Sequence, residues 1–272
     1  MAYIAREMAH KMELIIPIEE LLLNAKYGQI ICYPRYDPAI LKKRIEEMRR
    51  IGIKAVVFSG GKSISGVPVL GKGCVGIVIA AILEDNNKVA LKILRTDVEA
   101  GRLLHEVEML RIANSVNVGP KLLGFSECLL TMEYIDGELL PKWVKGLSGD
   151  KESVLKRLRR VLRDILEQCW RLDSIGLDHG ELSWADKHII IDPEEKPHIL
   201  DFETASNRRM VSNVTSVTQY LFIRGRTASL ITQKFGSIDK NILIQILRAY
   251  KTKRTRDQFE SILETIGLLT QK

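Results

Sequence analysis

The chain has 272 residues, of which 46% are hydrophobic and 28% are charged, and this balance is typical of a globular protein with one large domain or two lobes. Its four cysteines are scattered without a C-x-x-C pair, which argues against a zinc site or a disulfide framework and favours a reducing compartment. No apolar run approaches the roughly 20 residues that span a bilayer, and the N-terminus lacks the apolar core of a signal peptide. We therefore expect a cytoplasmic protein with no membrane partner.

The net charge of +7 gathers in three basic clusters. They comprise Lys42, Lys43, Arg44, Arg49 and Arg50, then Lys156–Arg163, and then Lys251–Arg256. Solvated helix faces explain such clusters, and contact with RNA or a ribosomal particle is the alternative. Aromatic residues are not interleaved as in RNA-recognition motifs, so the charge alone does not establish an RNA partner.

The first 52 residues contain two predicted helices and no catalytic motif. One covers Pro17–Lys26, and the other follows Asp37 as N-cap, with Pro38 at its first position, and runs to Arg50. We interpret this segment as a stabilising extension, with a docking appendage as the alternative.

A β-branched strand, Ile53–Phe58, leads into Gly61-Lys62-Ser63, which resembles the end of a phosphate-binding P-loop. That motif requires a glycine where Val56 stands, so we reject it.

Glycines at positions 71, 73 and 76 form a G-x-G-x-x-G pattern. A dinucleotide-binding fold would need a helix directly after them. Here Ile77–Leu83 and Val89–Leu94 read as two strands joined by a turn, so the glycines are predicted in a hairpin of an antiparallel sheet. Glycines in such a turn let backbone N–H groups approach phosphates closely.

Lys92 lies in the second of these strands, and the next segment, Thr96–Ala113, is predicted to be a helix. Thr96 and Glu99 form a candidate capping box at its start. Glu106 falls on the inner flank of the apolar stripe, and a buried acid needs a cationic partner. We therefore predict that Glu106 pairs with Lys92, with Glu99 as the rival.

The remaining elements are predicted from their apolar periodicity. They are a hairpin formed by Lys121–Phe125 and Cys128–Ile135, and helices at Val154–Trp170, Asp239–Lys251 and Arg256–Leu269, with the segment Asn213–Gly225 before the last two.

The segment Leu177–Glu203 carries the acids that point to chemistry. Its two apolar runs, 188–191 and 198–200, predict a β-hairpin with carboxylates at both ends. Glu181, Asp186 and Asp201 could then converge on one point. Converging carboxylates repel one another unless a cation such as Mg²⁺ lies between them, and Mg²⁺ commonly serves a phosphate ester.

Taken in order, these motifs resemble an atypical protein kinase of the RIO type, closest to a group of predicted archaeal Ser/Thr kinases. The resemblance covers residues from about 65 to 220, with H-x-E-L at His179–Leu182 and D-F-E at Asp201–Glu203. It implies an α+β, bilobal, protein-kinase-like fold. The domains would be an extension at 1–52, an N-lobe at 53–136 with an antiparallel sheet and one helix, and a reduced, mainly helical C-lobe at 137–272.

The resemblance also implies ATP and Mg²⁺ (or Mn²⁺ in its place) as cofactors and a protein substrate phosphorylated on Ser or Thr. Nucleotide contacts would come from Gly71, Lys72, Gly73, Gly76, Val78, Ala90, Lys92, the gatekeeper Met132 and the backbone of Glu133 and Ile135. Lys92, oriented by Glu106, would bind phosphates, and Glu181 would receive the proton of the attacking hydroxyl. Asp186 and Asp201 would hold the metal, and His179 would brace the loop.

Three departures from the family pattern keep other functions open. Glu181 replaces the usual Asp, Asp186 replaces Asn, and Glu203 replaces Gly. The alternatives are a small-molecule or sugar kinase, and a RIO-like ATPase or pseudokinase switch acting in RNA or ribosome maturation.

Overall fold

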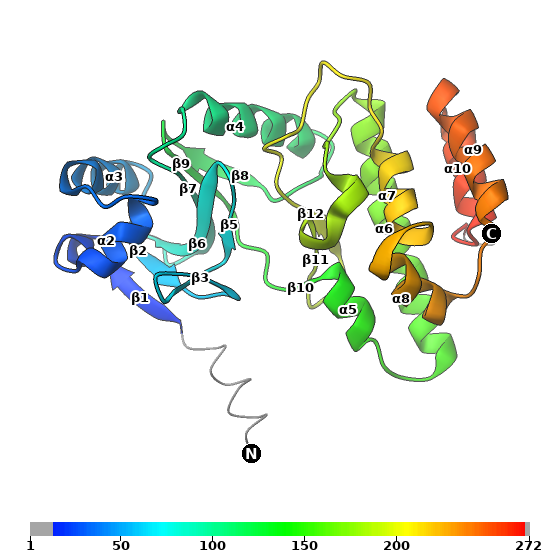
Figure 1. Cartoon of the computed structure of the whole chain (residues 1–272), viewed down its shortest axis with the longest axis horizontal. Coiled ribbons are helices and arrows are strands. Elements are labelled where there is room, and N and C mark those ends of the chain that lie inside the picture. The colour runs from blue at the N-terminus through cyan, green and yellow to red at the C-terminus, as the bar shows by residue number, and fades with distance from the viewer. Residues whose placement is uncertain (1–12, 270–272) are drawn as a thin grey trace. The chain divides into compact units, whose positions relative to one another are not determined.

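The computed structural model describes residues 13–269, so the first twelve residues of the predicted extension lie outside it. The chain forms two compact units (Figure 1). The first contains the described residues up to Glu108 together with Lys121–Tyr134, and the second contains Met109–Pro120 and the chain from Ile135 onward. An antiparallel sheet builds the first unit and helices dominate the second, which confirms the predicted α+β class with two lobes.

The sheet of the first unit is seven-stranded and antiparallel. Its order is β1 (Leu14–Pro17), β2 (Ile53–Phe58), β6 (Gly76–Leu83), β7 (Lys88–Leu94), β9 (Leu129–Glu133) and β8 (Leu122–Phe125), with β5 (Gly71–Lys72) paired to β6. A separate hairpin joins β3 (Lys62–Ile64) to β4 (Val67–Val69). Because Lys62 begins a strand and not a helix, the rejected P-loop is also absent from the structure.

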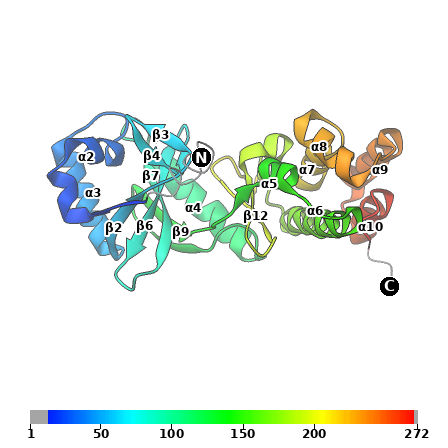
Figure 2. The same ribbon diagram turned by 90° about the horizontal axis from the view of Figure 1, so that it is seen from below.

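Residues 18–50 cover one face of this sheet with η2 (Ile18–Leu22), α2 (Ala25–Ile31) and α3 (Pro38–Arg50). The helix predicted from Pro17 to Lys26 is wrong, because the side chain of Asn24 accepts a hydrogen bond from Lys26 N and starts α2 there. The helix capped by Asp37 is confirmed. Apolar side chains of these elements share one core with β6 and β7, so the extension belongs to the first unit (Figure 2).

Helix α4 (Gly101–Asn114) packs on the other face of the sheet. We predicted that it starts at Thr96 with a capping box, and this is wrong. The Thr96 hydroxyl donates to the carbonyl oxygens of Cys32 and Tyr33 instead, and its N–H also donates to Tyr33. Thr96 is thereby held to the N-terminal segment, and the helix begins only after the following loop.

The second unit is organised around the long helix α6 (Lys151–Ser174), whose N-cap is Asp150. The other elements are β10 (Glu138–Leu139), α5 (Leu140–Gly146), η3 (Leu182–Lys187), β11 (Ile189–Ile191), β12 (Pro197–Ile199), α7 (Asn213–Phe222), α8 (Gly225–Phe235), α9 (Lys240–Lys253) and α10 (Arg256–Thr265). Helices α5 and α8 were not predicted. Between residues 13 and 269, each helix is too short or too polar to cross a bilayer.

Candidate functional site

Lys92 lies in the middle of β7 and is almost completely buried. The predicted ion pair is present, with Lys92 Nζ lying 2.6 Å from Glu106 Oε2. The sequence dictates this pair because Glu106 interrupts the apolar face of α4 that packs on the sheet, between Leu103 and Leu110. Two charges so removed from water are stable only when they lie against each other.

The strand register places the predicted nucleotide contacts on one face of the sheet. Val78 lies opposite Lys92 across β6 and β7, and Ala90 lies opposite Met132 across β7 and β9. Directly paired residues in an antiparallel sheet share a face, as do residues two apart in one strand. Val78, Ala90 and Met132 are only partly buried, so this apolar surface beside Lys92 remains open to a flat apolar group.

The predicted glycine hairpin forms between β5 and β6. Gly73 N donates to Gly76 O at 2.8 Å and closes the turn. A Cβ on Gly76 would lie 2.8 Å from the carbonyl oxygen of Ile93, so only glycine fits this close strand contact. Gly71 pairs with Val78, and Lys72 extends its ammonium over the Tyr33 ring, 4.8 Å from the centroid. Lys72 therefore contacts an aromatic ring of the N-terminal segment.

The predicted hinge follows Met132 at the end of β9. Glu133 N donates to the carbonyl oxygen of Lys121, and the Glu133 carboxylate accepts from Lys121 N. A base bound here would have to use the carbonyl oxygen of Glu133, because its N–H is engaged. Ile135 is partly buried and begins the second unit.

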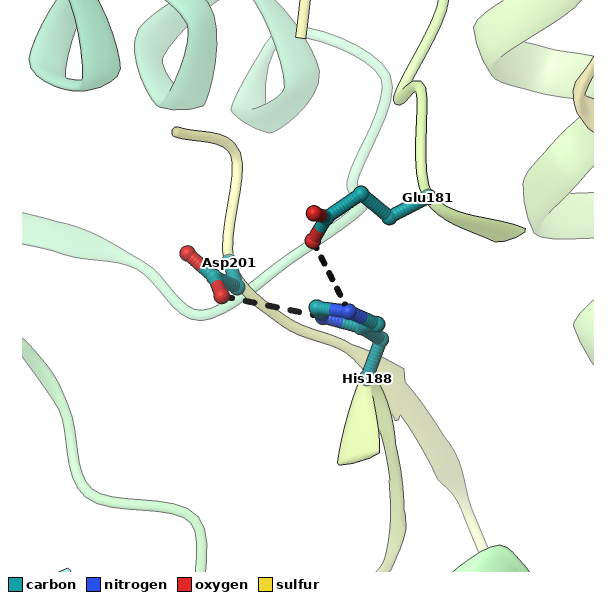
Figure 3. A group of neighbouring side chains, drawn as sticks. All are labelled: Glu181, His188 and Asp201. Carbon is teal, nitrogen blue, oxygen red and sulfur yellow. Dashed lines mark ion pairs between the residues drawn. The ribbon is translucent and has the colours of Figure 1, made fainter. Parts of the chain in front are cut away.

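Within the second unit, Glu181 and Asp201 converge on a buried imidazole (Figure 3). Glu181 precedes η3, and Asp201 follows β12. His188, just before β11, has Nε2 at 2.9 Å from Glu181 Oε2 and Nδ1 at 3.7 Å from Asp201 Oδ2. One ligand atom from each residue lies within 4.8 Å of the others, which is close enough to hold one metal ion.

The donor set fits a divalent cation. Two carboxylates suit Mg²⁺, and an imidazole beside them shifts the preference toward Mn²⁺ and other transition metals. If Nε2 of His188 carries the ring proton and donates it to Glu181, the lone pair on Nδ1 faces the Asp201 carboxylate. Such an arrangement, with one nitrogen fixed by a carboxylate, is common among metal-bound histidines.

Asp201 has an unusual backbone, with φ at +70°. Positive φ is uncommon outside glycine, and such conformations concentrate at functional sites. Leu200 N donates to His188 O at 2.8 Å, and the buried Phe202 ring packs 5.1 Å from that of His179. The residues on both sides of Asp201 are therefore fixed by contacts, which keeps its carboxylate directed toward His188.

Asp186 is not part of this group. Its Oδ1 accepts hydrogen bonds from the hydroxyl groups of Tyr220 and Thr227, both at 2.8 Å. The predicted convergence of three acids is thus a convergence of two acids and a histidine. The role of Asp186 as a metal ligand stays a prediction, and its other oxygen would have to serve.

His179 is fully buried and links the two acid-bearing ends of the segment. Its Nδ1 accepts from Glu181 N at 3.4 Å, while Nε2 lies 2.9 Å from the carbonyl oxygen of Leu200. Burial lowers its pKa to about 4, so the ring is neutral at pH 7 and Nε2 is the nitrogen that donates. This hydrogen bonding is the bracing role predicted for His179.

A buried polar network that sequence reasoning missed supports this loop. Asn213, the first residue of α7, accepts from His179 N at 2.8 Å and donates to Asp173 Oδ1 and Leu177 O. The carboxylate of Asp178 accepts from Ser212 N. Neither Asn213 nor Asp178 belongs to a recognised motif. The only signal in the sequence was a polar residue starting an apolar helix.

Gly180, next to Glu181, has φ at +93°, which disfavours a side chain there. A Cβ at this position would also lie 2.9 Å from Thr204 Oγ1. The tight turn that positions Glu181 therefore requires glycine.

The comparisons with known proteins add one relative. The chain is 33% identical to the uncharacterized protein MJ1211 of Methanocaldococcus jannaschii over 123 residues, which are 45% of this chain and 97% of that protein. No protein-family model matches the chain.

Proposed function

The chain belongs to the same family as the uncharacterized protein MJ1211. We propose that it is an ATP-dependent phosphotransferase, most specifically a Ser/Thr protein kinase. The proposal is based on two clusters of charged residues, the Lys92–Glu106 pair and the group formed by Glu181, His188 and Asp201. The buried Lys92–Glu106 pair, beside an open apolar sheet face and a glycine hairpin, is the observation that carries the proposal. Lys92 offers a fixed cation for phosphates, and Val78, Ala90 and Met132 offer a surface for a base.

The second unit supplies the groups for transfer. Glu181 is partly exposed and can accept the proton of an attacking hydroxyl, while its hydrogen bond with His188 fixes its orientation. Asp201 and His188 would hold a divalent metal, with Asp186 as a further predicted ligand. When bound, Mg²⁺ or Mn²⁺ would offset the negative charge of the phosphates.

Some basic side chains of the clusters that could contact RNA already form ion pairs with acidic residues of this chain. Arg157 and Arg160 both pair with Glu195, and Lys43 Nζ lies 3.2 Å from Glu127. RNA or ribosomal contact remains a secondary proposal, and so does ATPase activity without a protein substrate.

Phosphate transfer from γ-labelled ATP, with Mg²⁺ or Mn²⁺, tests the proposal. Labelled protein is expected with the wild type and is expected to be lost in Asp201→Asn, whereas Glu194→Gln on the exposed β11–β12 turn should retain it. Release of free phosphate without labelled protein would instead identify an ATPase. Label found only in a metabolite fraction would identify a small-molecule kinase. ATP binding without any turnover would identify a pseudokinase.

A further inference from the structure

A pocket that is unrelated to these clusters lies within the second unit. It has a volume of about 330 Å³ and lies against α7, the turn before α8, and α9. Both α8 and α9 pack against α7, and the three helices are seen together in Figure 1. Pockets of this size and larger accommodate small organic ligands.

Three cations line this pocket and no acidic side chain does. Arg248 and Lys251 lie three residues apart on α9 and therefore share a helix face. Arg224 approaches from another element, as the N-cap residue of α8. The structure gives these three side chains no ion pair with any residue between 13 and 269. Like charges gathered without a counter-charge raise the local positive potential and favour an anion.

This charge distribution is specific to the pocket and does not simply reflect a basic protein. A larger pocket of about 1210 Å³ between α6 and the end of α10 is lined by four basic and four acidic side chains. Its charges balance, so it has no preference for an anion. The smaller pocket differs because all of its charged groups have the same sign.

The remaining lining narrows the ligand class. Ile223, Ile244 and Leu247 form an apolar wall next to the cations. Thr215 Oγ1 already donates to Ser212 O at 3.0 Å, so towards a ligand its hydroxyl oxygen can only accept. Arginine forks bind phosphate oxygens in pairs, and the three positive charges are enough to offset the two negative charges of a phosphate monoester.

We propose that this pocket binds a small phosphate-bearing ligand, with phosphate held by Arg224, Arg248 and Lys251 and its organic part against the apolar wall. The site is independent of the proposed kinase activity. Helix α7 also carries Asn213 and Tyr220, which hold the loop around Glu181 and Asp186, so the ligand would contact the helix that supports that loop.

The test uses the full chain, inorganic pyrophosphate as the probe and isothermal titration calorimetry at low ionic strength. Two matched double variants each remove two positive charges from the same two elements. Arg224→Gln with Lys251→Gln changes the pocket, whereas Arg226→Gln with Lys253→Gln changes exposed neighbours that do not line it. The pocket variant is expected to weaken binding at least about tenfold and the control less than about twofold, because charge-assisted contacts are lost only in the first.

A second measurement locates the bound pyrophosphate. Amide chemical-shift changes are expected at Thr215 and Gln219 in the wild type, and they should persist when Lys92→Met and Glu106→Gln are combined. Equal weakening in both double variants, or shifts confined to β6 and β7, would overturn the proposal. Binding of an RNA oligonucleotide that depends on Arg224 and Lys251, without pyrophosphate binding, would also overturn it in favour of an RNA surface.

Discussion

The Nζ atom of Lys92 lies 2.6 Å from Oε2 of Glu106, and the two side chains are only 6% and 3% exposed. One comes from the middle of β7 and the other from α4, so the pair joins the sheet to the helix that packs on it. A buried apolar cluster that includes Val75, Leu103 and Leu130 lies between this face of the sheet and α4. Removing either partner would take away the counter-charge that lies 2.6 Å from the other.

We predict that Lys92→Met destabilises the protein by about 3–5 kcal/mol, because the Glu106 carboxylate is then buried without its cation. The double variant Lys92→Met with Glu106→Gln should recover most of that loss while remaining inactive. Urea denaturation measures both. Lys54→Met on β2, whose ammonium donates to Asn86 in an exposed turn, is the control and should cost less than about 1 kcal/mol. A double variant as unstable as the single one would show that the charge pair is not the cause.

His188 should determine which metal supports activity. Imidazole suits Mn²⁺ better than it suits Mg²⁺, so His188→Asn, which offers an oxygen, is expected to lower the ratio of the Mn²⁺-supported to the Mg²⁺-supported rate about tenfold. His198→Asn removes a histidine that also contacts a carboxylate, Asp192 at 2.9 Å, but lies outside the cluster. It should leave the ratio unchanged. An unchanged ratio in His188→Asn would mean that this side chain is not a metal ligand.

Local signals in the sequence sufficed for much of the fold. Asp37 followed by Pro38 defines the start of α3, and alternating apolar runs around a glycine turn define the β5–β6–β7 arrangement. The start of α4 could not be predicted, because Thr96 can cap a helix or hydrogen-bond to a distant carbonyl. In the structure, the Thr96 hydroxyl donates to the carbonyl oxygen of Tyr33, which is 63 residues away in sequence.

The same distinction holds for the site. The partnership of Lys92 and Glu106 could be predicted because an acid within an apolar stripe needs a nearby cation. His188 could not, since it begins an apolar run and reads as a strand residue, and only the folded hairpin brings it between Glu181 and Asp201. Asp186 fits a motif position by spacing alone, yet its oxygen is bound by hydroxyl groups of α7 and α8.

Asn213 should act as a positioning residue. Replacing it with alanine leaves the buried His179 N–H without its acceptor and removes one of the hydrogen bonds that the Asp173 carboxylate accepts. An unsatisfied buried group costs about 1–3 kcal/mol. We expect a lower kcat with little change in the KM for ATP, because Glu181 lies only two residues after His179 in the loop. Steady-state kinetics and thermal denaturation measure the two effects. Asn241→Ala on the exposed start of α9 is the control, and equal effects in both variants would contradict the assignment.

The neutral state of His179 should make stability depend on pH. Burial lowers its pKa in the folded protein to about 4, whereas the unfolded chain has the ordinary value of about 6.5. Between these values the unfolded state binds more protons, so the free energy of unfolding falls as the pH is lowered through this range. The contribution is fully present above about pH 6.5, and by pH 4 the loss is about 3 kcal/mol. In the neutral ring, Nδ1 accepts a hydrogen bond from the N–H of Glu181. Protonation would place an N–H on Nδ1, so the two N–H groups would face each other and this hydrogen bond would be lost.

Urea denaturation at pH 7.5 and at pH 4 measures this dependence. In His179→Gln, whose amide can still donate to Leu200 O, the difference in unfolding free energy between the two pH values should shrink by about 3 kcal/mol. His105→Gln, at an exposed position on α4, should leave the difference unchanged. Because other groups titrate in the same range, the comparison of these two variants isolates the contribution of His179. An equal pH dependence in both would show that the pKa of His179 is not lowered in the folded protein.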